Sequence, residues 1–166
     1  KYSMLVRQPE KEHFAINREY GVGFIAFSPL AQGLLTNKYL HGIPEASRAH
    51  KSHGFLQESE INQEVIAKVT ALNDLALQRG QSLAEMALAW LLNNKQITSV
   101  IIGTSSLNQL KDNLKAKENA SFSADELELI ENILASYTYQ RGKISLSLQI
   151  LFIKQPLHYY IIEAVL

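Results

Sequence analysis

Residues 28–33 read Ser-Pro-Leu-Ala-Gln-Gly and follow an apolar run at 22–27. A serine hydroxyl, main-chain N–H groups and a glutamine amide in one turn are donors that can surround a pyrophosphate. Phe27, at the end of the run, can stack on a flat ring. A plainer interpretation also fits, in which Phe27 belongs to the core and Ser-Pro only starts a turn.

A second group of donors follows another apolar run, at 97–102. Gly103 allows close approach to the backbone, and Ser105 adds a hydroxyl. Ser106 is placed to begin a helix, whose free N–H groups and dipole favour an anion. The pattern therefore predicts a phosphate site, although Ser106 can equally be a helix cap and nothing more.

The helix after Ser106 carries further polar groups. Gln109 and Asn113 are one turn apart and share a face, and Asp112 borders that face. Two amides and a carboxylate in this arrangement can hydrogen-bond an adenine and a ribose. The alternative is that the amides simply face water.

Two cations, Lys38 and Arg48, follow the first turn. Either can neutralise a phosphate on a ribose, and either can be an ordinary solvated surface charge. The sequence indicates no metal site, because no histidine has HExxH-type spacing or a matching set of carboxylates. The five histidines are His13, His41, His50, His53 and His158. No GxSxG, GxGxxG or P-loop motif occurs.

The elements that must position these residues alternate along the chain. The runs at 22–27 and 97–102 are short and continuously apolar, which is typical of strands buried on both faces of a parallel sheet. A shorter apolar stretch at 2–6 is a further strand candidate. Helical patterns follow them, with capping boxes that start at Ser82, Ser106 and Ser123. The expected helices cover residues 9–20, 59–80, 82–92, 106–114 and 123–134.

This βα alternation predicts an α/β fold in which ligands collect at the carboxyl ends of the strands. Only about three strands are visible, whereas a closed parallel barrel has eight. An incomplete sheet exposes strand edges, so we expect dimerisation or aggregation. The long low-periodicity segment at 28–58 is typical of functional or disordered loops.

Composition excludes several classes of protein. The chain has 166 residues, 16 basic and 16 acidic, so no global charge favours nucleic acid or an anionic membrane. It has no cysteine, which excludes disulfides and thiolate chemistry. The N-terminus lacks a signal-peptide pattern, and polar residues interrupt the hydrophobic tail at 138–166. We therefore expect a cytoplasmic protein.

Four stretches make the sequence resemble the aldo-keto reductase family, especially the branch of bacterial L-glyceraldehyde 3-phosphate reductases and potassium-channel β subunits. They are YSMLVR (2–7), GVGFIAFSPLAQGLLTNKYLHGIPEASR (21–48), QRGQSLAEMALAWLL (78–92) and TSVIIGTSSLNQLKDNLKA (98–116). The resemblance implies that 1–137 is the C-terminal, NADP-binding half of a (β/α)₈ TIM barrel, an incomplete parallel sheet with outer helices. Residues 138–166 form an atypical hydrophobic tail.

The resemblance also assigns the two turns to one NADP(H) site. Its cofactor-binding residues are Phe27, Ser28, Pro29, Leu30, Ala31, Gln32, Gly33, Lys38, Arg48, Gly103, Ser105, Gln109, Asp112 and Asn113. The family's catalytic Tyr, Lys, Asp and His come from the other half of the barrel, so no catalytic residue is assigned. We expect an isolated chain without turnover that works with a complementing N-terminal half on a small carbonyl substrate. The alternatives are a non-catalytic NADP(H)-binding module and a degenerate fragment.

Overall fold

The computed structural model of the chain describes residues 1–40, 42–43, 61–135 and 159–163. The predicted cation Arg48 and all histidines except His13 lie outside these ranges, as does most of the tail. No helix in the described ranges is long and apolar enough to cross a membrane.

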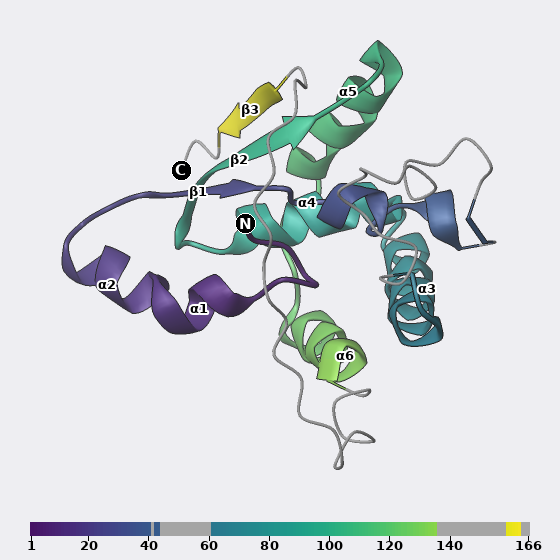
Figure 1. The fold of residues 1–166 in the computed structure, drawn as a ribbon, viewed down its shortest axis with the longest axis horizontal. Coiled ribbons are helices and arrows are strands. Elements are labelled where there is room, and N and C mark those ends of the chain that lie inside the picture. Colours follow the sequence, from purple (N-terminus) through teal and green to yellow (C-terminus); the bar gives the residue numbers. More distant parts are fainter. Residues whose placement is uncertain (41, 44–60, 136–158, 164–166) are drawn as a thin grey trace.

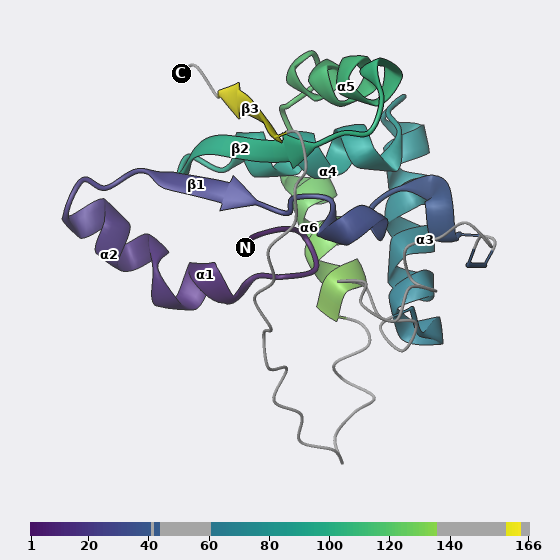
Figure 2. The same ribbon diagram turned by 45° about the horizontal axis from the view of Figure 1, so that its top comes forward.

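The sheet has three strands, β1 (Phe24–Phe27), β2 (Ile97–Gly103) and β3 (Tyr159–Glu163), in the order β1-β2-β3. β1 and β2 are parallel, as predicted, and Phe27 lies opposite Ile101. β3 is antiparallel to β2, so the sheet is mixed and not purely parallel (Figures 1 and 2). The parallel sheet was expected from the βα alternation alone, whereas β3 belongs to the tail that follows this alternation.

Two expectations for the N-terminal region are met only in part. The helix expected over 9–20 is interrupted at His13, which has a φ of −117°, and forms two short helices, α1 (Gln8–Glu12) and α2 (Phe14–Glu19). The strand expected at 2–6 is reduced to one bridge between Ser3 and Val6. Its start still meets the sheet, since the Tyr2 N–H donates to the Phe27 carbonyl at 3.2 Å.

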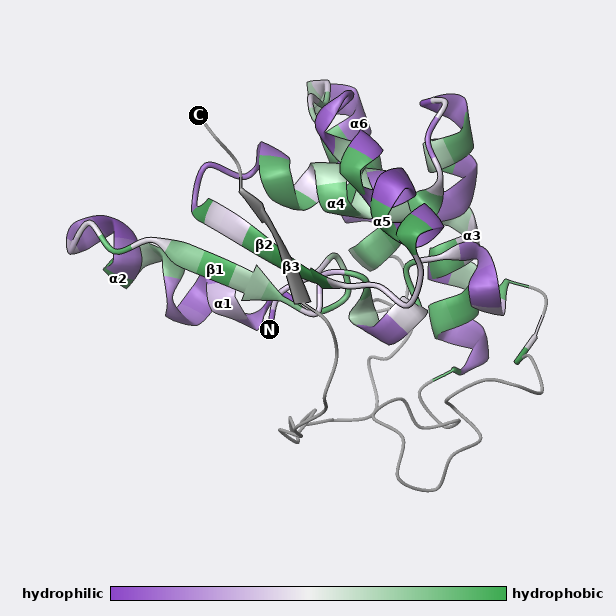
Figure 3. Ribbon diagram, turned by 90° about the horizontal axis from the view of Figure 1, so that it is seen from above, coloured by the Kyte–Doolittle hydropathy of each residue, from purple (hydrophilic) through white to green (hydrophobic). Residues whose placement is uncertain are grey.

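β1 is not buried on both faces, contrary to expectation. Ala26 is fully buried, whereas its neighbours Ile25 and Phe27 are 57% and 39% exposed. Alternate side chains of a strand point to opposite faces, so only the Ala26 face is covered by the described helices. Figure 3 shows that β1 is hydrophobic along its length.

The remaining helices are α3 (Gln63–Gln78), α4 (Leu83–Asn93), α5 (Leu107–Leu114) and α6 (Ala124–Ala135). The short 3₁₀ turns η1 (Ala31–Gly33) and η2 (Asn37–Tyr39) lie between β1 and α3, and η5 (Lys115–Lys117) lies between α5 and α6. α4 is apolar almost all round, so it lies in the core, in contact with β2, α3 and α5. The predicted capping box at Ser82 is confirmed, because Ser82 and Glu85 exchange both hydrogen bonds.

An arginine joins the C-terminal end of α3 to the start of α6. The Arg79 side chain is 5% exposed, pairs with Glu126 at 2.5 Å and donates to Gln81 and to the Ser121 carbonyl, both at 2.9 Å. Its guanidinium carbon lies 3.8 Å from the centre of the Phe122 ring. These contacts fix the two helices that flank α4.

Candidate functional site: two turns at one edge of the sheet

The two predicted donor turns lie at the same edge of the sheet. Because β1 and β2 are parallel and Phe27 is in register with Ile101, their carboxyl ends come out side by side (Figures 1 and 2). The turn at 28–33 leaves β1 there, and the turn at 103–106 leaves β2. The arrangement places both groups of donors next to one another. Whether they share a ligand stays a prediction.

The first turn is strained. Ser28, Ala31 and Gln32 have φ values of 59°, 46° and 60°, a region that residues with a Cβ seldom adopt. Hydrogen bonds within the turn hold it, from Ala31 N–H to the Ser28 carbonyl at 3.1 Å and from Gly33 N–H to the Leu30 carbonyl at 2.8 Å. Such conformations cost about 1–3 kcal/mol each and gather at functional sites.

The same turn keeps donors available. Among the described residues, neither the Leu30 N–H nor the Ser28 hydroxyl has a hydrogen-bond partner. Phe27 is 39% exposed, so the interpretation of this ring as a core residue is wrong. Pro29 is buried and shapes the turn from within. A donor pair beside an exposed aromatic ring fits a phosphate attached to a flat ring system.

Lys38 lies on η2, beyond this turn. Its backbone N–H donates to the Thr36 hydroxyl at 3.2 Å, and its ammonium group lies 5.4 Å from the centre of the Tyr39 ring. The side chain is exposed, so a phosphate can reach it. Its predicted role remains open.

In the second turn, hydrogen bonds within the protein already engage donors that the sequence analysis assigned to a ligand. The Ser105 N–H and hydroxyl both donate to the Gln109 side-chain oxygen at 2.9 Å. The Ser106 hydroxyl caps α5 by accepting from the Gln109 N–H at 3.2 Å. The helix-cap interpretation therefore holds for Ser106, and a ligand must take over the Ser105 donors from Gln109.

The polar residues on α5 are not equivalent. Asp112 is paired with Lys115 at 2.8 Å, which raises the pKa of that lysine. Asn113 is only 6% exposed, and its amide has no hydrogen bond to the described residues. No fully buried side-chain nitrogen or oxygen among them lacks a partner, so the amide atoms hold the small exposed part of Asn113. An unpaired amide in a buried setting fits the edge of a base.

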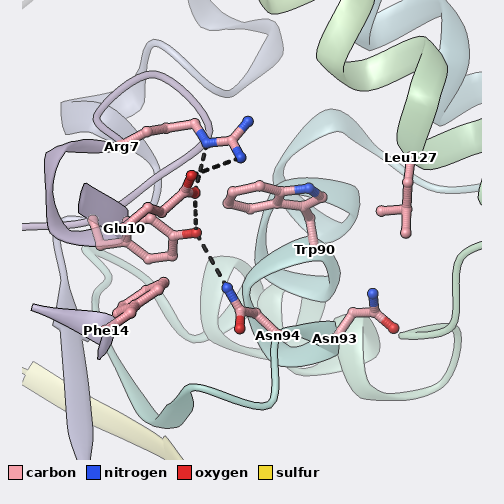
Figure 4. Close-up of a pocket in the computed structure, with 8 residues that line it drawn as sticks. Arg7, Glu10, Phe14, Trp90, Asn93, Asn94 and Leu127 are labelled. Carbon is pink, nitrogen blue, oxygen red and sulfur yellow. Dashed lines mark hydrogen bonds and ion pairs between the residues drawn. The ribbon is translucent and has the colours of Figure 1, made fainter. Parts of the chain in front are cut away.

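A second polar region, which the sequence reasoning missed, lies behind the sheet (Figure 4). A cavity of about 350 Å³ is lined by Tyr2, Arg7, Glu10, Phe14, Trp90, Asn93, Asn94 and Leu127. The Tyr2 hydroxyl donates to Glu10 at 2.6 Å and accepts from Asn94 at 3.3 Å. Arg7 binds both Glu10 and Glu131 at 2.6 Å and lies 5.0 Å from the Trp90 ring centre.

The polar groups of this region are held by hydrogen bonds and ion pairs with one another. Burial, together with the hydrogen bond to Glu10, raises the pKa of Tyr2 well above its ordinary value. Burial alone would lower the pKa of Arg7, but the bonds to Glu10 and Glu131 outweigh it and raise it. A tyrosine held in this way is a poor proton donor, so the region stabilises the fold. The pair Arg7–Glu131 spans 124 positions, and no local pattern in the sequence could reveal it.

The described ranges contain no group of three or more His, Asp or Glu side chains that could hold a metal ion. The chemistry available at the sheet edge is therefore that of hydroxyl, amide and main-chain donors with an exposed ring. Such groups bind and orient a ligand.

Comparison with known proteins identifies the family of this chain and several relatives. The model of the aldo/keto reductase family matches residues 1–135. The chain is 48% identical over 123 residues to L-glyceraldehyde 3-phosphate reductase from Escherichia coli O157:H7, covering 69% of this chain and 34% of that protein. It is 37% identical over 119 residues to a probable voltage-gated potassium channel subunit beta from Oryza sativa subsp. japonica, covering 70% and 36%.

Among solved structures, the glycerol dehydrogenase from Gluconobacter oxydans aligns with a TM-score of 0.67 at 20% identity, over 91% of this chain and 44% of that one. Similarity at this identity shows a shared fold. The chain spans about a third of the length of the curated relatives it matches.

Proposed function

The chain belongs to the aldo/keto reductase family of oxidoreductases, and from this we propose that it is the C-terminal, NADP(H)-binding part of a (β/α)₈ reductase. The intact enzyme reduces an aldehyde or ketone in the cytoplasm. The observation that carries the proposal is the adjacency of the two donor turns at the carboxyl edge of β1 and β2. Ligands of parallel βα folds collect at this edge.

The residues of the edge fit the cofactor. The Leu30 N–H and the Ser28 hydroxyl would hold the pyrophosphate, because both are unpaired among the described residues. The exposed ring of Phe27 would pack against the nicotinamide, and the amide of Asn113 would meet the adenine. When bound, NADPH supplies the hydride that reduces the carbonyl carbon.

Protonation of the carbonyl oxygen needs a donor that the described residues do not offer at the edge. The Tyr2 hydroxyl is bound to Glu10 and Asn94 behind the sheet, with a raised pKa. A developing alkoxide without a donor stays unstabilised. We therefore expect NADPH binding without turnover from the chain alone.

The complementing part would dock on the uncovered face of β1. Ile25 and Phe27 expose large apolar side chains there, and β1's outer edge bonds only to Tyr2 among the described residues. The complementing part would cover this face, extend the sheet from the outer edge of β1 and add the proton donor.

Two assays test the proposal. Titrating NADPH into the chain, with NADH as comparison, should give saturable quenching of cofactor fluorescence, and tighter binding of NADPH if Lys38 meets the 2′-phosphate. Methylglyoxal and L-glyceraldehyde 3-phosphate should give no turnover. Absence of binding at millimolar NADPH, or reduction at rates typical of enzymes, would each contradict the proposal.

A second candidate is a non-catalytic NADP(H)-binding module. It is favoured by the 37% identity to a probable potassium channel β subunit. The two candidates differ once a complementing half is supplied, since turnover then appears only if the chain is part of a reductase.

A further inference from the structure

The outer edge of β2 is occupied by a strand that does not belong to the family match. β3 pairs antiparallel with β2 from Ser99, opposite Glu163, to Gly103, opposite Tyr159. The family model matches residues 1–135 and therefore ends before β3. Figures 1 and 2 show β3 as the edge strand of the sheet, next to β2.

An open strand edge presents unpaired N–H and C=O groups, to which a strand of another chain can pair. Without β3, β2 would present five consecutive residues of such an edge, since the register covers Ser99 to Gly103. This stretch is apolar at Val100, Ile101 and Ile102. Long, apolar, open edges are predicted sites of association.

We propose that β3 is an intramolecular cap, which prevents the edge of β2 from pairing with a second copy of this chain. The backbone of β3 pairs with the edge groups of β2, so a second copy can no longer pair with this apolar edge. This role depends on strand pairing alone and does not require the proposed cofactor function. A complementing half that closes the barrel would have to displace β3 from the edge of β2.

The outer edge of β1 provides an internal comparison. There the described contact is the single hydrogen bond from the Tyr2 N–H to the Phe27 carbonyl. Among the described strands, only β2 therefore has its outer edge capped. Detaching β3 should let copies of the chain associate through β2, in addition to any association through β1.

A matched pair of proline substitutions tests the cap in the full chain. Successive N–H groups of a strand point to opposite edges, so Ile161→Pro and Ile162→Pro differ in whether the lost N–H faced β2. Ile161→Val and Ile162→Val keep the strand and serve as controls. The emission of Trp90, which is 6% exposed, reports that the core is intact.

Hydrogen exchange of the β2 amides and sedimentation are then measured on each variant. We expect one proline variant to exchange the outward amides of Ser99–Gly103 about tenfold faster and to self-associate more tightly than its partner and the controls. Unchanged exchange in both proline variants would overturn the proposal. Faster exchange without tighter association would overturn it as well.

Discussion

Around Arg7 and Arg79 the charged side chains are paired on several sides. The turns that leave β1 and β2 instead keep a hydroxyl, an N–H and an amide without a partner among the described residues. Arg79 is bonded to Glu126, Gln81 and the Ser121 carbonyl. In contrast, the side chains of Ser28 and Asn113 have no hydrogen bond to the described residues. The contacts of the first region stabilise the fold, whereas the second region has the free donors that our proposal assigns to a ligand.

Backbone geometry separates the two regions in the same way. The helices flanking Arg79 end in ordinary caps, while the turn after β1 holds three non-glycine residues at positive φ. Strain of this kind persists where the surroundings enforce it and a function uses it. Substitutions should therefore affect stability in one region and binding in the other.

The largest effect is expected at Arg79. Arg79→Met keeps the stem but removes the ion pair and leaves acceptors of the α3–α6 connection unpaired, which should lower the free energy of unfolding by about 3 kcal/mol. Urea unfolding followed by Trp90 emission measures it. Lys111→Met, on an exposed position of α5, is the control and should change little. Equal stability of the two variants would remove the distinction drawn between the regions.

Next in size are losses of affinity at the sheet edge. Ser28→Ala and Asn113→Ala each remove one predicted cofactor contact, so each should weaken NADPH binding about tenfold. Fluorescence titration measures the affinity, and thermal melting checks that the fold is retained. Unaltered affinity in both variants would remove these residues from the cofactor site.

Replacing Ser28 by glycine should raise the stability of the fold and lower the affinity for NADPH. Ser28→Gly relieves a positive φ of 59°, and we expect a gain of about 1 kcal/mol in the free energy of unfolding. It also removes the hydroxyl, so NADPH affinity should fall as far as in Ser28→Ala. A variant that is less stable than the alanine variant would show that this turn is not strained.

The smallest effect concerns pH. The hydrogen bond from the Ser123 backbone lowers the pKa of Glu126, with a further contribution from Arg79 against the opposing effect of burial. The unfolded chain therefore binds the Glu126 proton more tightly than the folded chain does. The stabilisation by the ionised Glu126 carboxylate is present above the unfolded-state pKa and is lost as pH falls through the folded-state pKa.

Glu126→Gln should accordingly lower the free energy of unfolding by under about 1 kcal/mol at pH 7, since the carboxylate is partly solvated. The difference from the parent should shrink in acid. Urea unfolding at several pH values measures it. A difference that grows as pH falls would show the opposite sign of linkage.

Local patterns predicted much of the fold. Apolar runs located β1 and β2, and serine followed by glutamate three residues later located the starts of α4 and α6. The parallel pairing also followed, because continuously apolar strands alternated with helices. These features depend on residues close together in the chain.

The rest depends on long-range or unfavourable features. Exposure of Ile25 reflects which face the described helices leave uncovered, and this is invisible within one strand. The positive φ at Ala31 runs against the preference of alanine, so propensity argues against it. The engagement of Ser105 by Gln109 was also missed, since their spacing fits a ligand equally well.

If both turns hold one cofactor, an NADPH titration followed by amide chemical shifts must detect it at both turns. We expect the signals of Leu30, after β1, and of Ser105, after β2, to shift together with a single dissociation constant. Shifts confined to one turn, or two different constants, would contradict it.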